Sequence, residues 1–582
     1  MTVENVQLQE LWSQDWSRAL KLWSSYLRLR EPAFLWTSEE EKKQGLTGSF
    51  AMIRFLDTQV VVSLRQVKQH HLEGFGLCIL AHEIGHHIYA PGDLTEHGRM
   101  LSRMARMLPR FDSRAPEIAN LYTDLMINHR LKVHHDLPLE KIYEKFAQDM
   151  SGSRLYLWYL RIYEIIWNLP KTSLAKGNLA LDEEGDAILA SRIIRRFSDH
   201  PVEASGRFAA LALARLEADA QSQAGQSVPW MDTLGAAEGS EIPEGLIQDQ
   251  ADPQDSIHPS LDPLLNDLAP GDIPQDSTET ESPARGQNRS PDEFVKLLRV
   301  MGMKITEEDA AMKYYKEMAA PLVIPFPKRS RPPSMELHPE GLDVWDVGQP
   351  LEKIDWLETL LRGPVVIPGI TAVERMEGES PGSEKTAKPL NLDIYIDSSG
   401  SIPDPRKSFS PLCLAGAVMA LSALRAGARV RAVLWSGPGE VLSTPGFTRD
   451  VKEVFKILTG YFGGSTAFPL NNLVEFYNNP QGGDRLDPGE KTHILVISDE
   501  GVDTMLEVST TRPEPGKALA QALKKAGGGG SLVLNIGGNG WLQGPIPQAL
   551  GTLGWVFYRV QSWEEMVGFS RDFSRRTWGK DI

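Results

Sequence analysis

Apolar runs and amphipathic stretches alternate along the last third of the chain. Runs rich in β-branched and aromatic residues predict strands at 390–396, 428–435, 492–497, 531–536 and 555–560. Around them, apolar residues recur at helical spacing, which predicts helices at 412–426, 450–461, 469–477, 517–526, 545–553 and 563–575. Strands that alternate with helices form a mainly parallel sheet covered on both faces. We therefore expect an α/β domain with a Rossmann-like sheet over residues 389–582.

The first 219 residues follow a different pattern, in which helical spacing dominates. It predicts helices at 3–30, 115–132, 139–150, 154–168, 183–198 and 203–218. Two short β-branched runs, 50–55 and 59–64, flank Asp57 and Thr58, which is a hairpin signal. We expect residues 1–219 to form a mostly helical α+β domain around this small strand element.

Residues 220–291 lack such periodicity and carry 13 acidic residues against two basic ones. A segment this polar and acidic buries too little apolar surface to offset its conformational entropy. We expect an acidic disordered linker here, and a docking tail for a basic partner is the alternative. Helical spacing resumes after it, and we expect the helical and extended segment 292–388 to pack on the C-terminal domain.

One predicted helix, within residues 77–91, carries the spacing H-E-x-x-H in His82, Glu83 and His86. Residues i and i+4 share a helix face, so the two imidazoles can bind one Zn²⁺. The glutamate between them can act as the general base that deprotonates water. The alternative is a buried helix whose histidines are only hydrogen-bonded.

The third zinc ligand is expected from the predicted helix 115–132, and Asp124 is the residue we select. The metzincin pattern is excluded, because Tyr89 and Gly92 stand where it requires glycine and histidine. Other side chains in this region remain open as ligands: Glu117, His129, Asp93 and His97.

Oxygen-bearing side chains follow the predicted strands of the C-terminal domain. Asp397, Ser399 and Ser401 form a D-x-S-x-S sequence directly after the first strand. Thr466 lies in a GGST loop, and Asp499 follows the strand at 492–497. Ligands of open α/β sheets bind at the carboxyl ends of the strands. Two carboxylates and three hydroxyls suit a hard cation, so we expect a Mg²⁺ site there.

These motifs resemble two known families. The last 190 or so residues resemble a von Willebrand factor A (VWA) domain with an intact metal-ion-dependent adhesion site, in which an acidic residue of a partner completes the Mg²⁺ shell. The hairpin followed by the H-E-x-x-H helix resembles a zincin-like metallopeptidase. The run IANLYTDLMIN resembles the I-A-x-D-x-x-I-N helix of bacterial metallopeptidases that carry a VWA domain, although the spacing before the aspartate differs.

The order of helical domain, acidic linker and VWA domain is also similar to the VWA subunits of cobalt and magnesium chelatases. Such proteins work with MoxR-type AAA+ ATPases, and this chain has no Walker A sequence of its own. The resemblance therefore implies an ATPase of that type as the partner, in a prokaryotic stress-response or phage-defence system.

Composition limits the other partners and the location. The formal net charge of −16 argues against binding nucleic acid through phosphate contacts. The two cysteines, Cys78 and Cys413, lie far apart in apolar surroundings, which suggests a reducing compartment. The N-terminus has no basic-then-apolar signal sequence and no apolar run reaches membrane-spanning length, so we expect a cytoplasmic protein with no membrane contact.

Two hypotheses for function follow. In the first, the chain is a zinc-dependent metallopeptidase that acts on a protein substrate, with Glu83 as base and His82, His86 and Asp124 as ligands. Its VWA domain binds Mg²⁺ and docks the ATPase. In the second, the chain is a non-proteolytic adaptor or chaperone subunit for the ATPase, with a structural or vestigial zinc site. A structural zinc has four protein ligands, whereas a catalytic zinc keeps one open position.

Overall fold

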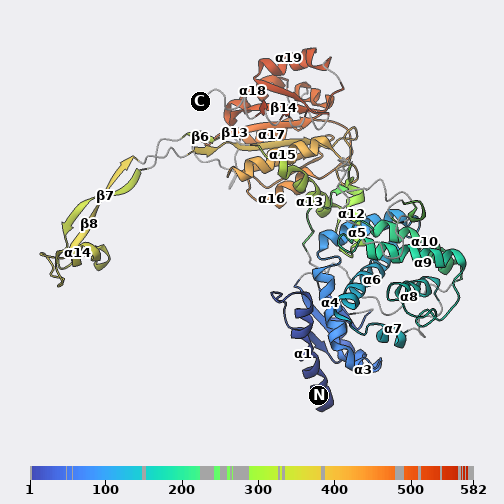
Figure 1. The fold of residues 1–582 in the computed structure, drawn as a ribbon. Helices are drawn as coiled ribbons and strands as arrows, with labels where there is room; N and C mark the ends of the chain where they lie inside the picture. The colour runs from blue at the N-terminus through green and yellow to red at the C-terminus, as the bar shows by residue number, and fades with distance from the viewer. Residues whose placement is uncertain are drawn as a thin grey trace. The chain divides into compact units, whose positions relative to one another are not determined.

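The structure is a computed structural model of the 582-residue chain. It describes residues 3–46, 49–54, 57–146, 153–222, 241–249, 258–262, 265, 287–324, 328–330, 335–381, 387–478, 490–508, 513–537, 540–561, 565, 568–569 and 572–573. The chain divides into two compact units (Figure 1). The N-terminal unit comprises Met1–Tyr314 with Arg406–Ser408, and the C-terminal unit comprises Tyr315–Pro405 with Phe409–Ile582.

The N-terminal unit begins with a small sheet and the helices next to it. In chain order these are α1 (Val3–Trp23), β1 (Ala33–Leu35), α2 (Ser38–Gln44), β2 (Ala51–Arg54), β3 (Gln59–Ser63), α3 (Leu64–Gln69) and α4 (Gly76–Ile88). β2 pairs antiparallel with β3, which confirms the predicted hairpin, and β1 pairs parallel with β3 on its other side. The sheet order β1-β3-β2 leaves β2 at an edge.

The rest of this unit is helical: α5 (Leu94–Met107), α6 (Ala115–His135), α7 (Glu140–Phe146), α8 (Arg154–Ile166), α9 (Leu181–Arg196) and α10 (Ser205–Ser222). The helices α1 and α6 both pack on α4, and Gly85 is where they come closest. A Cβ atom at Gly85 would lie 2.5 Å from Ile127 of α6 and 2.7 Å from Trp23 of α1. The small residue thus admits two side chains, and Trp23 also donates a hydrogen bond to the Ala81 carbonyl at 2.8 Å.

Parts of the expected acidic linker are folded against the N-terminal unit. Leu246, Ile247 and Leu265 are buried, and Asp262 forms a buried ion pair of 2.8 Å with Arg207 of α10. Two short strands, β4 (Gln248–Asp249) and β5 (Gln287–Asn288), pair antiparallel. The expectation of disorder is therefore corrected for these residues. The prediction averaged charge over the whole segment and so missed a few isolated apolar residues that pack on the helices. Residues 223–240, 250–257, 263–264 and 266–286 lie outside the described ones.

The segment 292–388 is also divided differently from the prediction. Its first helices, α12 (Pro291–Val300) and most of α13 (Glu307–Ala319), belong to the N-terminal unit, and Met301 lies against Gly98 of α5. The C-terminal unit then adds β6 (Lys328–Ser330), β7 (Met335–Val344), α14 (Trp356–Arg362), β8 (Val373–Pro381) and β9 (Ala387–Pro389). The antiparallel pair of β7 and β8 was not predicted, because its register shifts between Pro339 and Gly341 and its apolar residues follow no strand alternation.

The remaining C-terminal residues form the predicted α/β fold, whose mainly parallel sheet is confirmed. Its strands are β10 (Asn391–Asp397), β11 (Val430–Trp435), β12 (Val441–Ser443), β13 (Thr492–Ser498), β14 (Gly527–Leu534) and β15 (Trp555–Arg559). Its helices include α15 (Pro411–Arg425), α16 (Val451–Leu458), α17 (Leu470–Asn478), α18 (Pro515–Ala526) and α19 (Pro545–Thr552). The helix predicted at 563–575 lies largely outside the described residues.

The sheet order is β12-β11-β10-β13-β14-β15, with all pairs parallel except β11 with β12. Alternate residues of each strand face opposite layers. Tyr395 and Val496 belong to the core shared with α17 and α18, whereas Ile396 and Ile497 lie against Gly416 of α15. From β10 the chain adds β11 on one side of the sheet, and later β13 on the other side. The loops after β10 and β13 therefore flank the switch point, where folds of this type bind ligands. None of the described helices is both long and apolar enough to cross a bilayer.

Candidate metal centres

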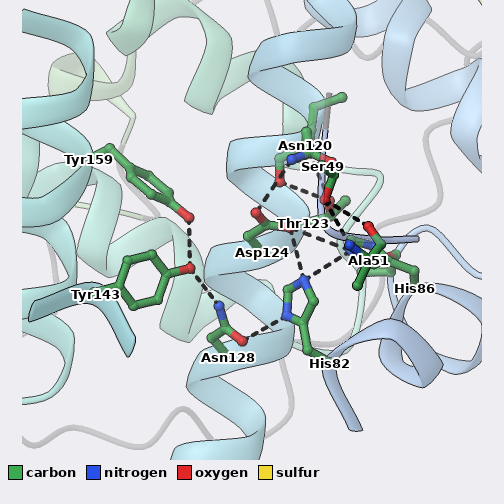
Figure 2. Close-up of polar contacts among 12 residues, drawn as sticks. Ser49, Ala51, His82, His86, Asn120, Thr123, Asp124, Asn128, Tyr143 and Tyr159 are labelled. Atoms are coloured by element: carbon green, nitrogen blue, oxygen red, sulfur yellow. Dashed lines mark hydrogen bonds and ion pairs between the residues drawn. The ribbon is translucent and has the colours of Figure 1, made fainter. Parts of the chain in front are cut away.

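The side chains of His82, His86 and Asp124 meet between α4 and α6 (Figure 2). The Nε2 atoms of the histidines are 3.2 Å apart, and Asp124 Oδ1 lies 3.5 Å from the first and 3.4 Å from the second. In a tetrahedral zinc site with bonds of about 2.0–2.1 Å, neighbouring ligand atoms are about 3.3 Å apart. Two imidazole nitrogens and one carboxylate oxygen at these distances fit Zn²⁺.

The group is closed on one side and partly open on the other. The side chain of His86 is fully buried, whereas those of His82 and Asp124 keep 12% and 11% of their exposure. Among the residues that the structure describes, no fourth His, Cys, Asp or Glu joins the three. A metal held here would therefore retain a coordination position that these side chain types do not fill.

Asn128 sets the orientation of His82. Its amide nitrogen donates to the hydroxyl oxygens of Tyr143 and Tyr163, both at 2.9 Å, so its carbonyl oxygen must face His82 Nδ1, which lies 2.8 Å away (Figure 2). A carbonyl oxygen only accepts, so Nδ1 of His82 carries the proton and Nε2 presents its lone pair to the site.

His86 reaches the same tautomer by another route. Its Nδ1 lies 3.2 Å from the carbonyl oxygen of Ala90, just beyond the end of α4. That oxygen also accepts only, so His86 donates from Nδ1, and its Nε2 faces His82 and Asp124. The two Nδ1 contacts thus turn both Nε2 atoms toward Asp124, where a metal would bind.

Three tyrosine hydroxyls form a closed set behind Asn128. Tyr143 of α7 lies 3.2 Å from Tyr159 and 2.9 Å from Tyr163, and the last two, both on α8, are 3.0 Å apart. Burial raises the pKa of Tyr159 and of Tyr163 well above the usual value, so both stay protonated. Each hydroxyl can donate to the next, which makes the set a neutral support for Asn128.

The polar face of α6 has a regular spacing that the sequence analysis did not use. Asn120, Asp124 and Asn128 follow at intervals of four residues and so share one face of the helix. Asn120 donates to Asp124 Oδ2 at 3.4 Å, on the carboxylate oxygen that faces away from the histidines. This spacing is the sequence signal that could have identified Asn128.

The alternative third ligands are placed elsewhere. Glu117 forms an ion pair with Arg114, and Asp93 caps α5 by accepting from the Glu96 amide at 2.8 Å. His97 and His129 do not belong to the group of three, and burial lowers the pKa of His129 to about 4. Glu83 is 1% exposed on α4, one residue after His82.

The predicted magnesium ligands gather at the carboxyl ends of β10 and β13. Ser401 Oγ donates to Asp499 Oδ2 at 2.6 Å, and the hydroxyls of Ser399 and Ser401 are 3.1 Å apart. Asp397 accepts from the Ser399 amide at 2.8 Å and from the Ser498 hydroxyl at 2.6 Å. All four predicted residues of these two loops are therefore brought together.

The loop that carries Thr466 joins the same place. A Cβ atom at Gly501, two residues after Asp499, would lie 2.4 Å from the Thr466 methyl group, so glycine is what lets the two loops approach. The Gly400 amide donates to the Gly464 carbonyl at 2.9 Å, which ties the first loop to the second. Burial and, to a smaller extent, the charge of Asp499 raise the pKa of Asp397. Two carboxylates this close, with hydroxyls between them, fit a hard cation that offsets their repulsion.

Comparisons with known proteins add little to this geometry. No family model matches the chain, and no curated protein matches it. Solved structures similar to it include a von Willebrand factor type A protein from Catenulispora acidiphila, at 17% identity and a TM-score of 0.21, over 34% of this chain and 45% of that one. BatB from Bacteroides thetaiotaomicron matches at 14% identity and a TM-score of 0.21, over 32% of this chain and 98% of BatB. The chain spans less than half of the first structure, so we base the following proposals on its own strand order and site residues.

Proposed function

We propose that the chain is a zinc-dependent metallopeptidase of the zincin type, joined to a VWA domain that binds Mg²⁺ and docks a partner protein. The observation that carries the peptidase proposal is the convergence of His82, His86 and Asp124 from α4 and α6 at the spacing of zinc ligands. The opening beside His82 and Asp124 supports a catalytic rather than a structural role for the metal.

In this proposal each residue has a separate task. Zinc, when bound, supplies the Lewis acidity that polarises the scissile carbonyl. Glu83 takes the proton from the attacking water and passes it to the leaving amine. Asn128 keeps His82 in the ligand tautomer, and Asn120 holds the far oxygen of Asp124.

The substrate backbone would lie along β2. This strand is at the edge of its sheet, and it packs against α4, the helix that carries His82 and His86. An extended peptide can add to such an edge through main-chain hydrogen bonds. A protein segment in extended form is therefore the proposed substrate class.

For the VWA domain we propose the partner that the resemblance implies, a MoxR-type AAA+ ATPase in a prokaryotic stress-response or phage-defence system. An aspartate or glutamate of the partner would complete the Mg²⁺ shell formed by Asp397, Ser399, Ser401, Thr466 and Asp499. The absence of a Walker A sequence supports an ATPase supplied by another chain.

The second candidate is a non-proteolytic adaptor for the same ATPase. The 1% exposure of Glu83 favours it, because a general base has to reach the water that attacks the substrate. In this candidate Glu83 has no chemical role.

The Glu83→Gln variant distinguishes the two candidates. We expect wild type and Glu83→Gln to contain about one zinc each by elemental analysis, and His82→Ala to contain little. Wild type should cleave an unfolded protein such as casein, whereas Glu83→Gln should not, since the variant loses the base and keeps all ligands. Equal cleavage by both would reject the peptidase, and a zinc-loaded wild type that cleaves nothing, alone or with the ATPase, would favour the adaptor.

A further inference from the structure

An unusual amount of apolar surface lies on the module formed by the tip of the β7–β8 hairpin, which we define as residues 340–377. Single exposed apolar side chains are common on protein surfaces, but clusters of them mark binding sites. The residues of the module with more than half of their side chain exposed are Val347, Leu351, Trp356, Leu357, Leu360, Leu361, Val365 and Ile370.

Helix α14 of the module turns a polar residue toward the hairpin. Its apolar residues face solvent. Thr359 is fully buried and accepts a hydrogen bond from the Val373 amide at 3.1 Å. Leu357 and Leu361 are 69% and 71% exposed on the other side of the helix. The core of the module is small, consisting of Trp345, Ile354 and Ala372.

The outward direction of α14 is fixed by contacts within the module. Asp355 caps the helix by accepting from the Glu358 amide at 3.2 Å, and it also pairs with Arg375 of β8 at 2.5 Å. The exposed face is therefore not a consequence of a loosely attached helix. It is held outward by Thr359, which accepts from Val373 of β8, and by the pair of Asp355 with Arg375.

The charge of the module indicates what covers this face. Residues 340–377 contain eight acidic and three basic side chains. A second copy of the module would bring like charges together, and anionic lipid or nucleic acid would be repelled as well. We propose that this face binds an amphipathic helix of a partner protein whose apolar stripe is flanked by lysine or arginine.

A cavity of about 670 Å³ beside α14 suits such a partner. Its walls include the apolar side chains of Trp356 and Met376. Four carboxylates and two basic groups complete them: Glu352, Asp355, Glu374 and Glu377, with Lys353 and with Arg375, which is already paired with Asp355. A long basic side chain buries its aliphatic stem on an apolar wall and keeps its charge at the polar end. The cavity thus offers an apolar wall for the stem and carboxylates for the charge. The proposal does not depend on either metal centre.

The test uses the full chain and two synthetic helical peptides. Both peptides have leucine on one face; the other face carries lysine in one and glutamate in the second. Fluorescence anisotropy should show that wild type binds the lysine peptide at least tenfold more tightly than the Leu357→Ser/Leu361→Ser variant does. Leu181→Ser, which alters a leucine 91% exposed on α9, is the matched control and should bind like wild type. Acidic residues elsewhere also attract the lysine peptide, so the difference between variants is the readout.

Charge reversal provides the second measurement. Glu352→Lys/Glu377→Lys should weaken binding of the lysine peptide and strengthen binding of the glutamate peptide, which loss of folding would not do. Equal affinity of wild type and the double serine variant for the lysine peptide would overturn the proposal. Sedimentation showing self-association that the serine variant loses would assign the face to a second copy instead, and vesicle binding that the variant loses would assign it to a membrane.

Discussion

The two candidate metal centres differ in their ligand atoms and in the elements that carry the ligands. In the N-terminal unit the ligands come from two helices and include two imidazole nitrogens, and buried side chains such as Asn128 orient them. In the C-terminal unit the ligands are oxygens on loops, and backbone amides and neighbouring hydroxyls orient them. The first arrangement suits a tightly held zinc, and the second suits a hard cation whose shell a partner could complete.

The two units hold their ligand side chains in place by different means. Packed helices fix side chains directly, so a ligand on a helix needs only a neighbour to set its rotation. Loops at strand ends have no such packing, and the C-terminal ligands are instead tied to the sheet and to one another. Asp397 is the link, because it ends β10 and also accepts from Ser498 at the end of β13.

The largest expected effect is the loss of one metal without the other. His86→Ala removes a fully buried ligand and should abolish zinc binding while Mg²⁺ binding persists. Asp397→Ala should do the reverse. Elemental analysis for zinc and titration calorimetry for Mg²⁺ measure both.

The neighbouring His87→Ala is the control for the first variant, since His87 is not in the ligand group. Loss of both metals in either variant would mean that the two centres are not independent.

The next effect concerns buried ion pairs that stabilise each unit. Asp262→Ala removes the partner of Arg207, and Asp393→Ala removes that of Arg431 on β11; both arginines are nearly inaccessible. A buried charge without its partner costs about 3–5 kcal/mol, so both variants should unfold at lower denaturant concentration. Urea unfolding measures the loss.

The Asp262→Ala variant tests whether this part of the acidic segment is folded. A change below about 0.5 kcal/mol, the range of ordinary surface substitutions, would mean that residues 258–262 do not pack on α10 in solution.

A smaller effect is expected behind the zinc ligands. Asn128→Ala removes the group that sets the His82 tautomer and should weaken zinc binding about ten- to a hundredfold. Tyr159→Phe should have less effect, because Asn128 donates to Tyr143 and Tyr163 and not to Tyr159. Competition with a zinc chelator measures the affinities, and unchanged affinity in Asn128→Ala would show that α4 alone orients His82.

The smallest effect is the equivalent change in the C-terminal unit. Ser498→Ala removes one hydrogen bond to Asp397, and the Ser399 amide still holds the other oxygen. A loss of about 1 kcal/mol corresponds to roughly fivefold weaker Mg²⁺ binding. If calorimetry showed Mg²⁺ affinity falling as much as zinc affinity falls in Asn128→Ala, the two centres would depend equally on a single neighbouring side chain.

The sequence predicted five of the six strands of the C-terminal sheet because each contains a short apolar run, even where a buried charge such as Asp393 or Arg431 interrupts it. The short strand β12, which is only partly buried, was not predicted. The segment predicted at 492–497 is β13 (Thr492–Ser498), every residue of which is buried. It failed for the β7–β8 hairpin, where exposed apolar residues such as Leu342, Val344 and Met376 give no burial pattern. It also failed for Leu246 and Leu265, because isolated apolar residues in an acidic segment carry no periodic signal.

The sequence by itself determined which residues could bind metal, since H-E-x-x-H and D-x-S-x-S fix ligand spacing within a single helix or loop. Only the tertiary structure decided which distant residue joins them. Asp124 was one of several candidates until α6 was placed across α4, and Asn128 with its tyrosines had not been considered. The physical reason is that local spacing is set by backbone geometry, whereas contacts between elements depend on the packing of many side chains at once.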